Sequence, residues 1–374
     1  MLSVFCGCMS VLLTVLAGEK VATPVAEGRS PLPVTSPSDE KRSKRDELRA
    51  QLRKLPYKIV FESYRDGNWD IWSMRADGSK PANLTKSDKV DEMYPHASPD
   101  GAHILFVRDS GKGRSRKRNI CLMEADGSGT KLVAANARQP CWSPTGKQIA
   151  YMKSEYERFT TSSYGTAGLF FCHLASNRHR QHRDRTIEHI SYLCWSPDER
   201  WIFATVHGGM GYGHAGLAIE TRTERIREMD SIYGCRMDVS PDGKRILWNA
   251  EDQAIAVADL DLKASPPKVT NARIVLDCDW TEKMYHGDWS PCGKYIAFSY
   301  GPGWGSQHVG EPADDWKICV ADPEESNLWV SLATGGKGNK EPDWVPFRRG
   351  TPKAPKVPKT AKKPKAAKTI GAGK

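Results

Sequence analysis

The stretch Asp288-Trp289-Ser290-Pro291-Cys292-Gly293-Lys294-Tyr295-Ile296-Ala297-Phe298 decides the fold. Ser290 and Pro291 predict the start of a tight turn, because proline presets φ for the second position of a turn. Gly293 supplies the positive φ that the chain reversal requires. The residues from Tyr295 to Phe298 are strand formers. The stretch therefore predicts a strand, a turn and a second strand.

The same phrase recurs along the chain at a regular spacing. Each copy carries a proline, and the residues before these prolines lie 44 to 55 residues apart: Ser98, Ser143, Ser196, Ser240, Ser290 and Val345. A period of about 40 to 50 residues with a β-turn in each repeat is typical of a propeller with one four-stranded blade per repeat. A single copy would predict only a turn, whereas six copies predict an all-β, six-bladed β-propeller.

Each repeat contains a predicted β-hairpin, and the two ends of the repeat region are out of phase. The hairpins pair residues 58–64 with 69–75, 102–108 with 119–124, 147–153 with 168–175, 201–206 with 215–220, 244–249 with 254–260 and 294–300 with 316–322. No phrase precedes the first hairpin, and no hairpin follows the last phrase, Asp343-Trp344-Val345-Pro346. We therefore expect the C-terminal strand to complete the first blade, which removes exposed sheet edges. The predicted propeller covers residues 57–347.

The positive charge of the chain is concentrated at one end. The formal net charge is +10, but residues 348–374 hold ten basic residues and no acidic one. The rest of the chain is formally neutral, so its charge gives no support for nucleic-acid binding by the propeller. We predict a disordered Lys/Pro/Ala tail over residues 348–374. The tail is either a solvated appendage or a contact for polyanions.

The N-terminal region predicts export followed by a short helix. Residues 1–18 contain an apolar run that is too short to span a bilayer and resembles a signal peptide, although no Lys or Arg precedes it. A misassigned start, or a cytoplasmic protein with an apolar N-terminus, is the alternative. Residues 19–56 are a predicted linker with one helix over 38–54, where Leu48, Leu52 and Leu55 share a face. The ten cysteines contain no Cys-x-x-Cys pair and are expected to be buried apolar side chains.

The repeats also resemble a known family. The phrase Trp-Ser-Pro-Asp-Gly-Lys, then Asp-Ile-Trp-x-Met-x-Ala-Asp-Gly and a Leu-Thr strand, is similar to the TolB-type, WD-like propeller repeat, and residues 57–85 and 287–298 match well. The resemblance covers residues 57–346. It implies an exported, non-enzymatic protein that binds a protein or peptidoglycan-associated partner, in the periplasm or outside the cell. Residues 19–56 leave no room for the N-terminal α/β domain of TolB itself. We expect a monomer without a cofactor.

Aligning the six phrases gives two columns of candidate site residues. The first column, just before the Trp position, is His96, Cys141, Cys194, Asp238, Asp288 and Asp343. The second, two residues earlier, is Tyr94, Gln139, Tyr192, Arg236, His286 and Glu341. Strand alternation predicts that both columns face the central channel near its mouth. Such a polar ring would suit a peptide terminus, a sugar or a cation.

Several alternatives stay open for this ring. Its ligand types would suit a transition metal, but sixfold geometry spreads equivalent atoms too widely, and interblade packing is the simpler interpretation. A polysaccharide lyase or hydrolase would use His286, Arg236 and Tyr94. The His/Arg-dense stretch with His179, His182 and His189 is predicted to be an exposed outer hairpin.

Loop elaboration predicts a docking face. Long inserts occupy residues 109–118, 154–167, 207–213 and 301–315, and we expect them to share one face with the channel mouth. Their charges are interpreted as solvated. Docking on this face would use Trp304, Tyr94 and Tyr192 as aromatic anchors.

Overall fold

The computed structural model describes residues 37–111, 117–154, 165–304, 314–332, 335 and 337–347. The predicted signal peptide, residues 19–36 of the linker, the basic tail and parts of three inserts lie outside these residues. The chain divides into two compact units, residues 1–40 and 41–374, and the first contributes only the start of helix α1 (Pro37–Leu52) to the described chain. In the part of the chain that is described, no helix is long and apolar enough to cross a membrane.

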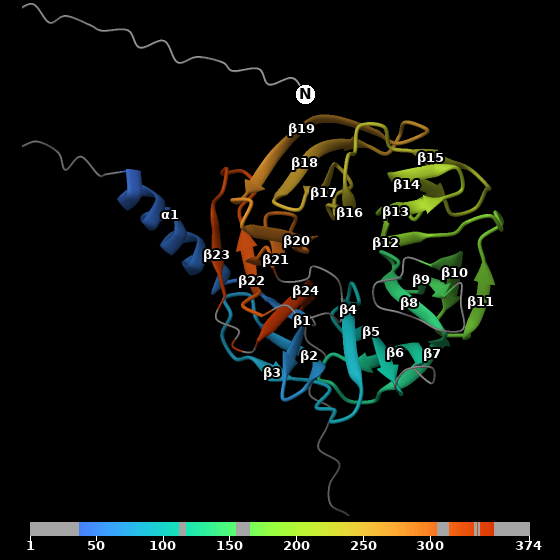
Figure 1. Ribbon diagram of the computed structural model, residues 1–374, viewed down its shortest axis with the longest axis horizontal. Coiled ribbons are helices and arrows are strands. Elements are labelled where there is room, and N and C mark those ends of the chain that lie inside the picture. The colour runs from blue at the N-terminus through green and yellow to red at the C-terminus, as the bar shows by residue number, and fades with distance from the viewer. Residues whose placement is uncertain are drawn as a thin grey trace, which may run out of the picture. The chain divides into compact units, whose positions relative to one another are not determined.

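Six four-stranded antiparallel sheets form the blades of a propeller (Figure 1). From the innermost strand outward, blade 1 is β24 (Gly338–Pro346), β1 (Tyr57–Arg65), β2 (Asn68–Arg75) and β3 (Ala82–Asn83), and blade 2 is β4 (Asp91–Ala97), β5 (His103–Ser110), β6 (Lys117–Glu124) and β7 (Lys131–Ala135). Blade 3 is β8 (Ala137–Trp142), β9 (Gln148–Ser154), β10 (Thr166–His173) and β11 (Arg178–Gln181). Blade 4 is β12 (Ile190–Trp195), β13 (Trp201–Gly209), β14 (Tyr212–Glu220) and β15 (Ile226–Glu228).

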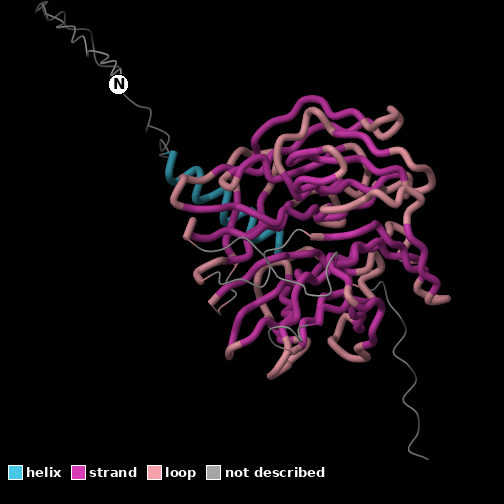
Figure 2. Tube along the Cα trace, turned by 45° about the vertical axis from the view of Figure 1, so that its right-hand side comes forward, coloured by secondary structure: helices cyan, strands magenta, loops and turns pink. Residues whose placement is uncertain are grey.

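Two further blades complete the all-β architecture. Blade 5 is β16 (Cys235–Val239), β17 (Arg245–Glu251), β18 (Ala254–Asp261) and β19 (Lys268–Asp277), and blade 6 is β20 (Glu282–Trp289), β21 (Ile296–Pro302), β22 (Lys317–Ala321) and β23 (Trp329–Ser331). Among the described residues α1 is the only helix (Figure 2). The predicted six-bladed propeller is confirmed.

The ring closes as predicted, by pairing the last strand with the first. β24 runs antiparallel to β1, and Trp344 lies opposite Ile59. Trp344 is buried, and its indole Nε1 donates a hydrogen bond of 3.2 Å to the carbonyl of Asp288 in blade 6. The closing strand therefore also joins the two blades on either side of the closure.

Helix α1 packs over that closure. Its buried Leu48 and Leu52 belong to one core cluster with Ile59 of blade 1 and Val320 of blade 6. The hydroxyl of Tyr295 donates to Gln51 Oε1 at 2.8 Å. The predicted helix is therefore confirmed with slightly different ends, and its apolar face covers the joint between the first and last blades.

The repeated turns have the conformation that the sequence predicts. Gly101, Gly146, Gly243 and Gly293 have φ values from 66° to 71°, the left-handed region that glycine adopts without a steric penalty. The serine before each proline anchors the turn: the Ser290 hydroxyl accepts the Tyr295 N–H at 3.0 Å. Ser98, Ser196 and Ser240 accept equivalent bonds. In blade 4 a non-glycine, Glu199, takes the same conformation, with φ 56°.

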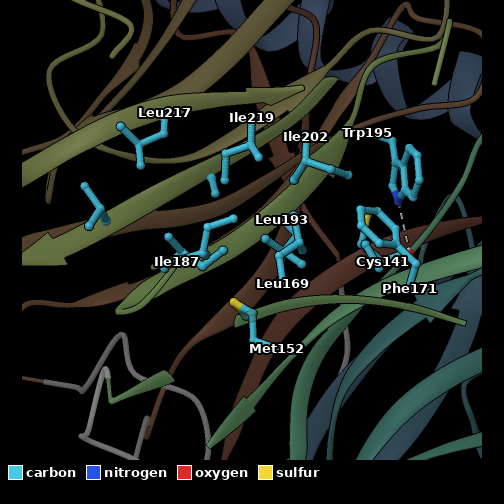
Figure 3. Packing of buried hydrophobic residues seen from close by; sticks show 14 of the residues in the cluster. Cys141, Met152, Leu169, Phe171, Ile187, Leu193, Trp195, Ile202, Leu217 and Ile219 are labelled. Atoms are coloured by element: carbon cyan, nitrogen blue, oxygen red, sulfur yellow. Dashed lines mark hydrogen bonds between the residues drawn. The ribbon is translucent and has the colours of Figure 1, made fainter. Parts of the chain in front are cut away.

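The hydrophobic core lies between neighbouring blades. Between blades 3 and 4, Phe171 packs edge-on against Trp195 at 5.6 Å between ring centroids, beside Leu169 and Ile202 (Figure 3). The Trp195 indole also donates to the carbonyl of Cys141 at 3.4 Å, drawn as a dashed line in Figure 3. Cys121, Cys141, Cys172, Cys194 and Cys319 are buried as expected, and the eight cysteines of the described chain form no disulfide.

Three expectations about loops and charges were wrong. Residues 207–213 are not a loop: β13 and β14 continue through them, with His207 opposite His214 and a tight turn at Met210-Gly211. Arg118 is not a solvated loop charge, because it is buried and its Nε donates to Asp109 Oδ1 at 2.6 Å. His182 is not exposed, because its Nε2–H donates to the Glu220 carbonyl at 2.9 Å in a buried position.

Candidate functional site

The innermost strands enclose a cavity of about 270 Å³. All twelve residues of the two predicted columns line it, so the expectation that they gather at the channel is confirmed. Its described lining reaches Pro144 and Pro291 of the Ser-Pro turns and includes no described residue of the hairpin inserts. The cavity therefore extends toward the end of the ring that carries these turns, the turn face. The opposite end, with the hairpin inserts and the connections between blades, is the loop face. The expectation that the inserts share one face with the channel mouth is therefore wrong for this cavity, which extends toward the turn face.

A backbone bulge, rather than simple alternation, turns the second column inward. In blade 2 the pairing of β4 with β5 shifts between Met93 and His96, so that one extra residue enters β4. All six residues of the column have positive φ, from 48° to 63°: Tyr94, Gln139, Tyr192, Arg236, His286 and Glu341. A left-handed conformation costs a non-glycine residue roughly 1–2 kcal/mol. The surrounding contacts must therefore stabilise the left-handed conformation at each of these six residues.

Hydrogen bonds from the preceding blade hold these bulges. The N–H of Tyr94 donates to Glu62 Oε2 at 3.1 Å, and the N–H of Arg236 donates to Thr205 Oγ1 at 3.1 Å. Glu62 is buried, and burial raises its pKa to about 7. The sequence analysis did not single out Glu62. A carboxyl directly after the apolar run Ile59-Val60-Phe61 was the available signal.

The second column, hereafter the closed ring, joins several of its own members to one another through side-chain contacts. Arg236 of blade 5 donates through Nη1 to Glu341 Oε1 of blade 1 at 2.7 Å. His286 of blade 6 lies between them, with Nε2 at 3.3 Å from the same oxygen. The Arg236 guanidinium also stacks over the Tyr192 ring, 3.8 Å from its centroid. These contacts join three consecutive blades, 5, 6 and 1, and the Tyr192 ring of blade 4 at this level of the channel.

The first column, hereafter the carboxyl ring, joins neighbouring blades in sequence. Asp238 Oδ2 accepts the Trp289 N–H at 2.8 Å, and Cys194 Sγ accepts the Val239 N–H at 3.3 Å. Asp288 Oδ2 accepts the Trp344 N–H at 3.3 Å. Each of these side chains therefore holds the backbone of the next blade, as the interblade-packing interpretation predicts.

Burial makes the carboxyl ring weakly acidic. Desolvation raises the pKa of Asp238 to about 6 and that of Asp343 to about 8. The pKa of Asp288 is raised well above its ordinary value, first by desolvation and then by the charges of Asp343 and Asp238. Burial lowers the pKa of His96, whose Nδ1 lies 3.4 Å from Asp343 Oδ2. A cation entering the cavity would favour the ionised carboxylates and release protons.

The described residues do not form a metal centre. No group of three or more His, Cys, Asp or Glu side chains among them is placed to hold a metal ion. The His and Cys members of the carboxyl ring contact backbone groups and Asp side chains instead, as with Cys194 Sγ donating to Asp238 Oδ1 at 3.2 Å.

Exposed aromatic side chains lie on the loop face. Trp280 is 84 % exposed, Tyr233 81 % and Trp304 80 %. Trp280 lies in the connection from β19 to β20, Tyr233 in that from β15 to β16, and Trp304 follows β21. The Gly303 N–H donates to the Thr281 carbonyl at 2.7 Å, which holds the backbones beside Trp304 and Trp280 together.

Hydrogen bonds also tie Tyr233 to this part of the molecule. Its carbonyl accepts the Trp248 indole N–H at 3.1 Å. The turn after β17 is hydrogen-bonded to the β19–β20 connection, because the Cys278 N–H donates to the Gln253 carbonyl at 3.0 Å.

Of the predicted aromatic anchors, Trp304 is exposed but does not line the cavity. Trp280 and Tyr233 were missed, although an aromatic residue beside Asp279 or Gly234 in a connection was a usable signal. Tyr94 and Tyr192, the other predicted anchors, are half-buried in the closed ring.

Comparison with known proteins shows the fold. No protein-family model matches the chain. The crystal structure of TolB from Acinetobacter baumannii superposes with a TM-score of 0.56 at 15 % identity, over 78 % of this chain and 67 % of that one. A putative TolB from Agrobacterium tumefaciens gives 0.53 at 15 % identity, over 75 % and 91 %. The chain is thus structurally similar to TolB β-propeller domains.

One curated relative is similar in sequence. An uncharacterized protein of Agrobacterium fabrum is 31 % identical over 105 residues, which are 25 % of this chain and 36 % of that protein. The matched segment therefore spans about a third of the relative's length.

Proposed function

We propose that the chain is a non-enzymatic binding scaffold that docks a protein or peptidoglycan-associated partner on its loop face. The observation that carries this proposal is the set of three aromatic side chains there, each about four-fifths exposed: Trp280, Tyr233 and Trp304. Exposed aromatics of this size bury about 150–250 Å² each on association and dominate many interfaces. The similarity to TolB propellers supports a binding role through the fold alone.

The architecture favours docking without rearrangement. The aromatic side chains project from connections whose backbones are hydrogen-bonded to the blades, as at Gly303 and Cys278. A preorganised surface loses little conformational entropy on binding, so more of the contact free energy appears as affinity.

Export belongs to the same proposal. It rests on the apolar run in residues 1–18, which lies outside the described residues. Cell fractionation and N-terminal sequencing of the mature protein in its source organism test it. A mature chain beginning after Ala17 in the periplasm or medium supports export, whereas an uncleaved chain in the cytoplasm contradicts it.

Docking is tested by the affinity for a partner isolated with the full chain from envelope extract. In the variants Trp280→Ala and Trp304→Ala, the Kd should rise by about 10- to 30-fold, the effect of losing an interface anchor. The matched control is Leu132→Ala on β7, which removes a side chain that is 61 % exposed outside this surface. Equal Kd values for all three variants and the parent chain would contradict docking on the loop face.

A polysaccharide lyase or hydrolase is the second candidate. The observation that favours it is the convergence of Arg236 and His286 on Glu341, at 2.7 and 3.3 Å. However, Arg236 already donates to Glu341 and stacks on Tyr192, and His286 Nδ1 is hydrogen-bonded to the Ser299 hydroxyl at 2.8 Å. The cavity of about 270 Å³ is also small for a polysaccharide. Cleavage of acidic polysaccharides that His286→Ala abolishes in a folded protein would favour the enzyme over the scaffold.

A further inference from the structure

The described chain ends beside the cavity. Strand β24 reaches the turn face at Pro346, whose carbonyl lies against the Gly101 turn so closely that a Cβ on Gly101 would be 1.8 Å from it. Asp343 and Trp344 of the same strand line the cavity, a few residues before Phe347. The chain that follows Phe347 therefore starts at the turn face, beside residues that line the cavity.

The positive charges of this following segment would favour the ionised form of the carboxyl groups in the cavity wall. Residues 348–374 carry ten basic residues and no acidic one. The cavity wall toward the turn face carries the carboxyl groups of Asp238, Asp288 and Asp343. An extended chain advances about 3.3 Å per residue, so ten residues would reach about 30 Å, enough to turn back into the ring.

The deep end of the cavity offers a hydrogen-bond donor that suits a polypeptide. Arg236 is 6 % exposed and lines the cavity, and its Nη2 is buried without a hydrogen-bond partner in the described structure. A buried donor of this kind is stabilised by an acceptor. A peptide carbonyl is such an acceptor, and a lysine of the same segment can meet the carboxyl groups.

We propose that the basic segment 348–374 of this chain docks into its own cavity from the turn face, with lysine ammonium groups against Asp238, Asp288 and Asp343. The docked segment occupies the channel, and any other cationic ligand has to displace it. This site lies at the opposite end of the ring from the docking surface on the loop face. The two proposals can therefore fail separately.

Zero-length carbodiimide cross-linking of the full chain, followed by peptide mapping, tests the contact. Lysines of residues 353–368 should become joined to Asp238, Asp288 or Asp343, and the yield should fall in high salt. Mixing isotopically light and heavy chains distinguishes a segment docked in its own ring from one exchanged between copies. Cross-links confined to other surface carboxyls, or formed between light and heavy chains, would overturn the proposal.

Limited trypsin digestion of the full chain gives a second measurement. Cleavage within residues 348–374 should be about tenfold faster in Asp288→Asn, and in Asp238→Asn should the first variant fold poorly, as expected when a docked segment is released. The control is Asp230→Asn, which removes the same charge from an exposed position on the loop face. Thermal unfolding checks that each variant is folded. Equal cleavage rates in folded parent, Asn variants and control would contradict docking.

Discussion

The closed ring and the carboxyl ring lie two residues apart on the same six strands, yet their side chains make different kinds of contact. In the closed ring, Arg236 and Glu341 join blades 5 and 1 across the channel. In the carboxyl ring, Asp238 and Cys194 each hold a backbone N–H of the adjacent blade. The first set joins side chains of blades 5, 6 and 1, and the second set joins side chains to the backbone of the next blade.

This difference shows how one repeated position can acquire two roles. Around the carboxyl ring five of the six side chains are the short Cys or Asp, and their hydrogen bonds reach the neighbouring blade. Around the closed ring several side chains are long, and charges of opposite sign occur at the same repeat position in different blades. Side-chain length and charge, together with the backbone bulge at the second column, therefore decide whether a position contacts only the next blade or also one further around the ring.

The strongest test of the contrast is Arg236→Met. It leaves Glu341 half-buried without its cation, and we expect a loss of about 3–5 kcal/mol in the free energy of unfolding, as is usual when one partner of a buried ion pair is removed. Urea denaturation followed by tryptophan fluorescence measures it. The double variant Arg236→Met/Glu341→Gln should recover a large part of the loss. A loss below about 1 kcal/mol in the single variant would place this pair among weak surface ion pairs.

A smaller effect is expected from Cys194→Ala in the carboxyl ring. The substitution removes the acceptor of the Val239 N–H, and an unsatisfied buried donor costs about 1–3 kcal/mol. Cys121→Ala is the matched control, because Cys121 is a buried strand cysteine in blade 2 outside both rings. Equal destabilisation of the two variants in urea would show that only side-chain volume matters at Cys194.

The last test of this comparison concerns pH. The native pKa of Asp343 is raised to about 8, so between pH 4 and 8 the folded chain keeps a proton that the unfolded chain releases. The free energy of unfolding should therefore fall as pH rises through this window, by at most about 1.4 kcal/mol per pH unit for this proton. The Asp343 carboxyl accepts the Ala97 N–H, and Asn can still accept it, so Asp343→Asn should flatten the slope and keep this hydrogen bond.

The pH measurement depends on the groups that face Asp343. Asp288 and Asp238 have raised pKa values and act in the same direction. His96 has a lowered pKa and acts in the opposite direction, since the unfolded histidine gains a proton below about pH 6.5. Both chains contain these groups, so the difference between parent and variant isolates Asp343. Parallel pH profiles of the two chains would contradict the raised pKa.

The sequence predicted the blades well because their signal is local. Ser290, Pro291 and Gly293 specify a turn within four residues, and the repetition of that turn sets the number of sheets. The missing half-repeat at each end predicted the pairing of Trp344 with blade 1.

The candidate site was only partly predictable because its contacts are distant in sequence. Arg236 and Glu341 are 105 residues apart, and nothing between them signals their pairing except opposite charges at one repeat position. The left-handed conformation of Tyr94 was unexpected because non-glycine residues rarely adopt it. Strand alternation therefore correctly predicted that the two columns lie together at the cavity, but it did not predict the backbone bulge that turns the second column inward.

The pairing of β24 with β1 also has a consequence for synthesis on the ribosome. Blade 1 contains the earliest strands to be translated, but its innermost strand, Gly338–Pro346, is among the last. While the other five sheets are being synthesised, the inner edge of β1 is unpaired, and a strand of another chain can pair with it. A nascent chain of this protein therefore depends on timely release, or on a chaperone at that edge, in a way that a helical bundle of equal length does not.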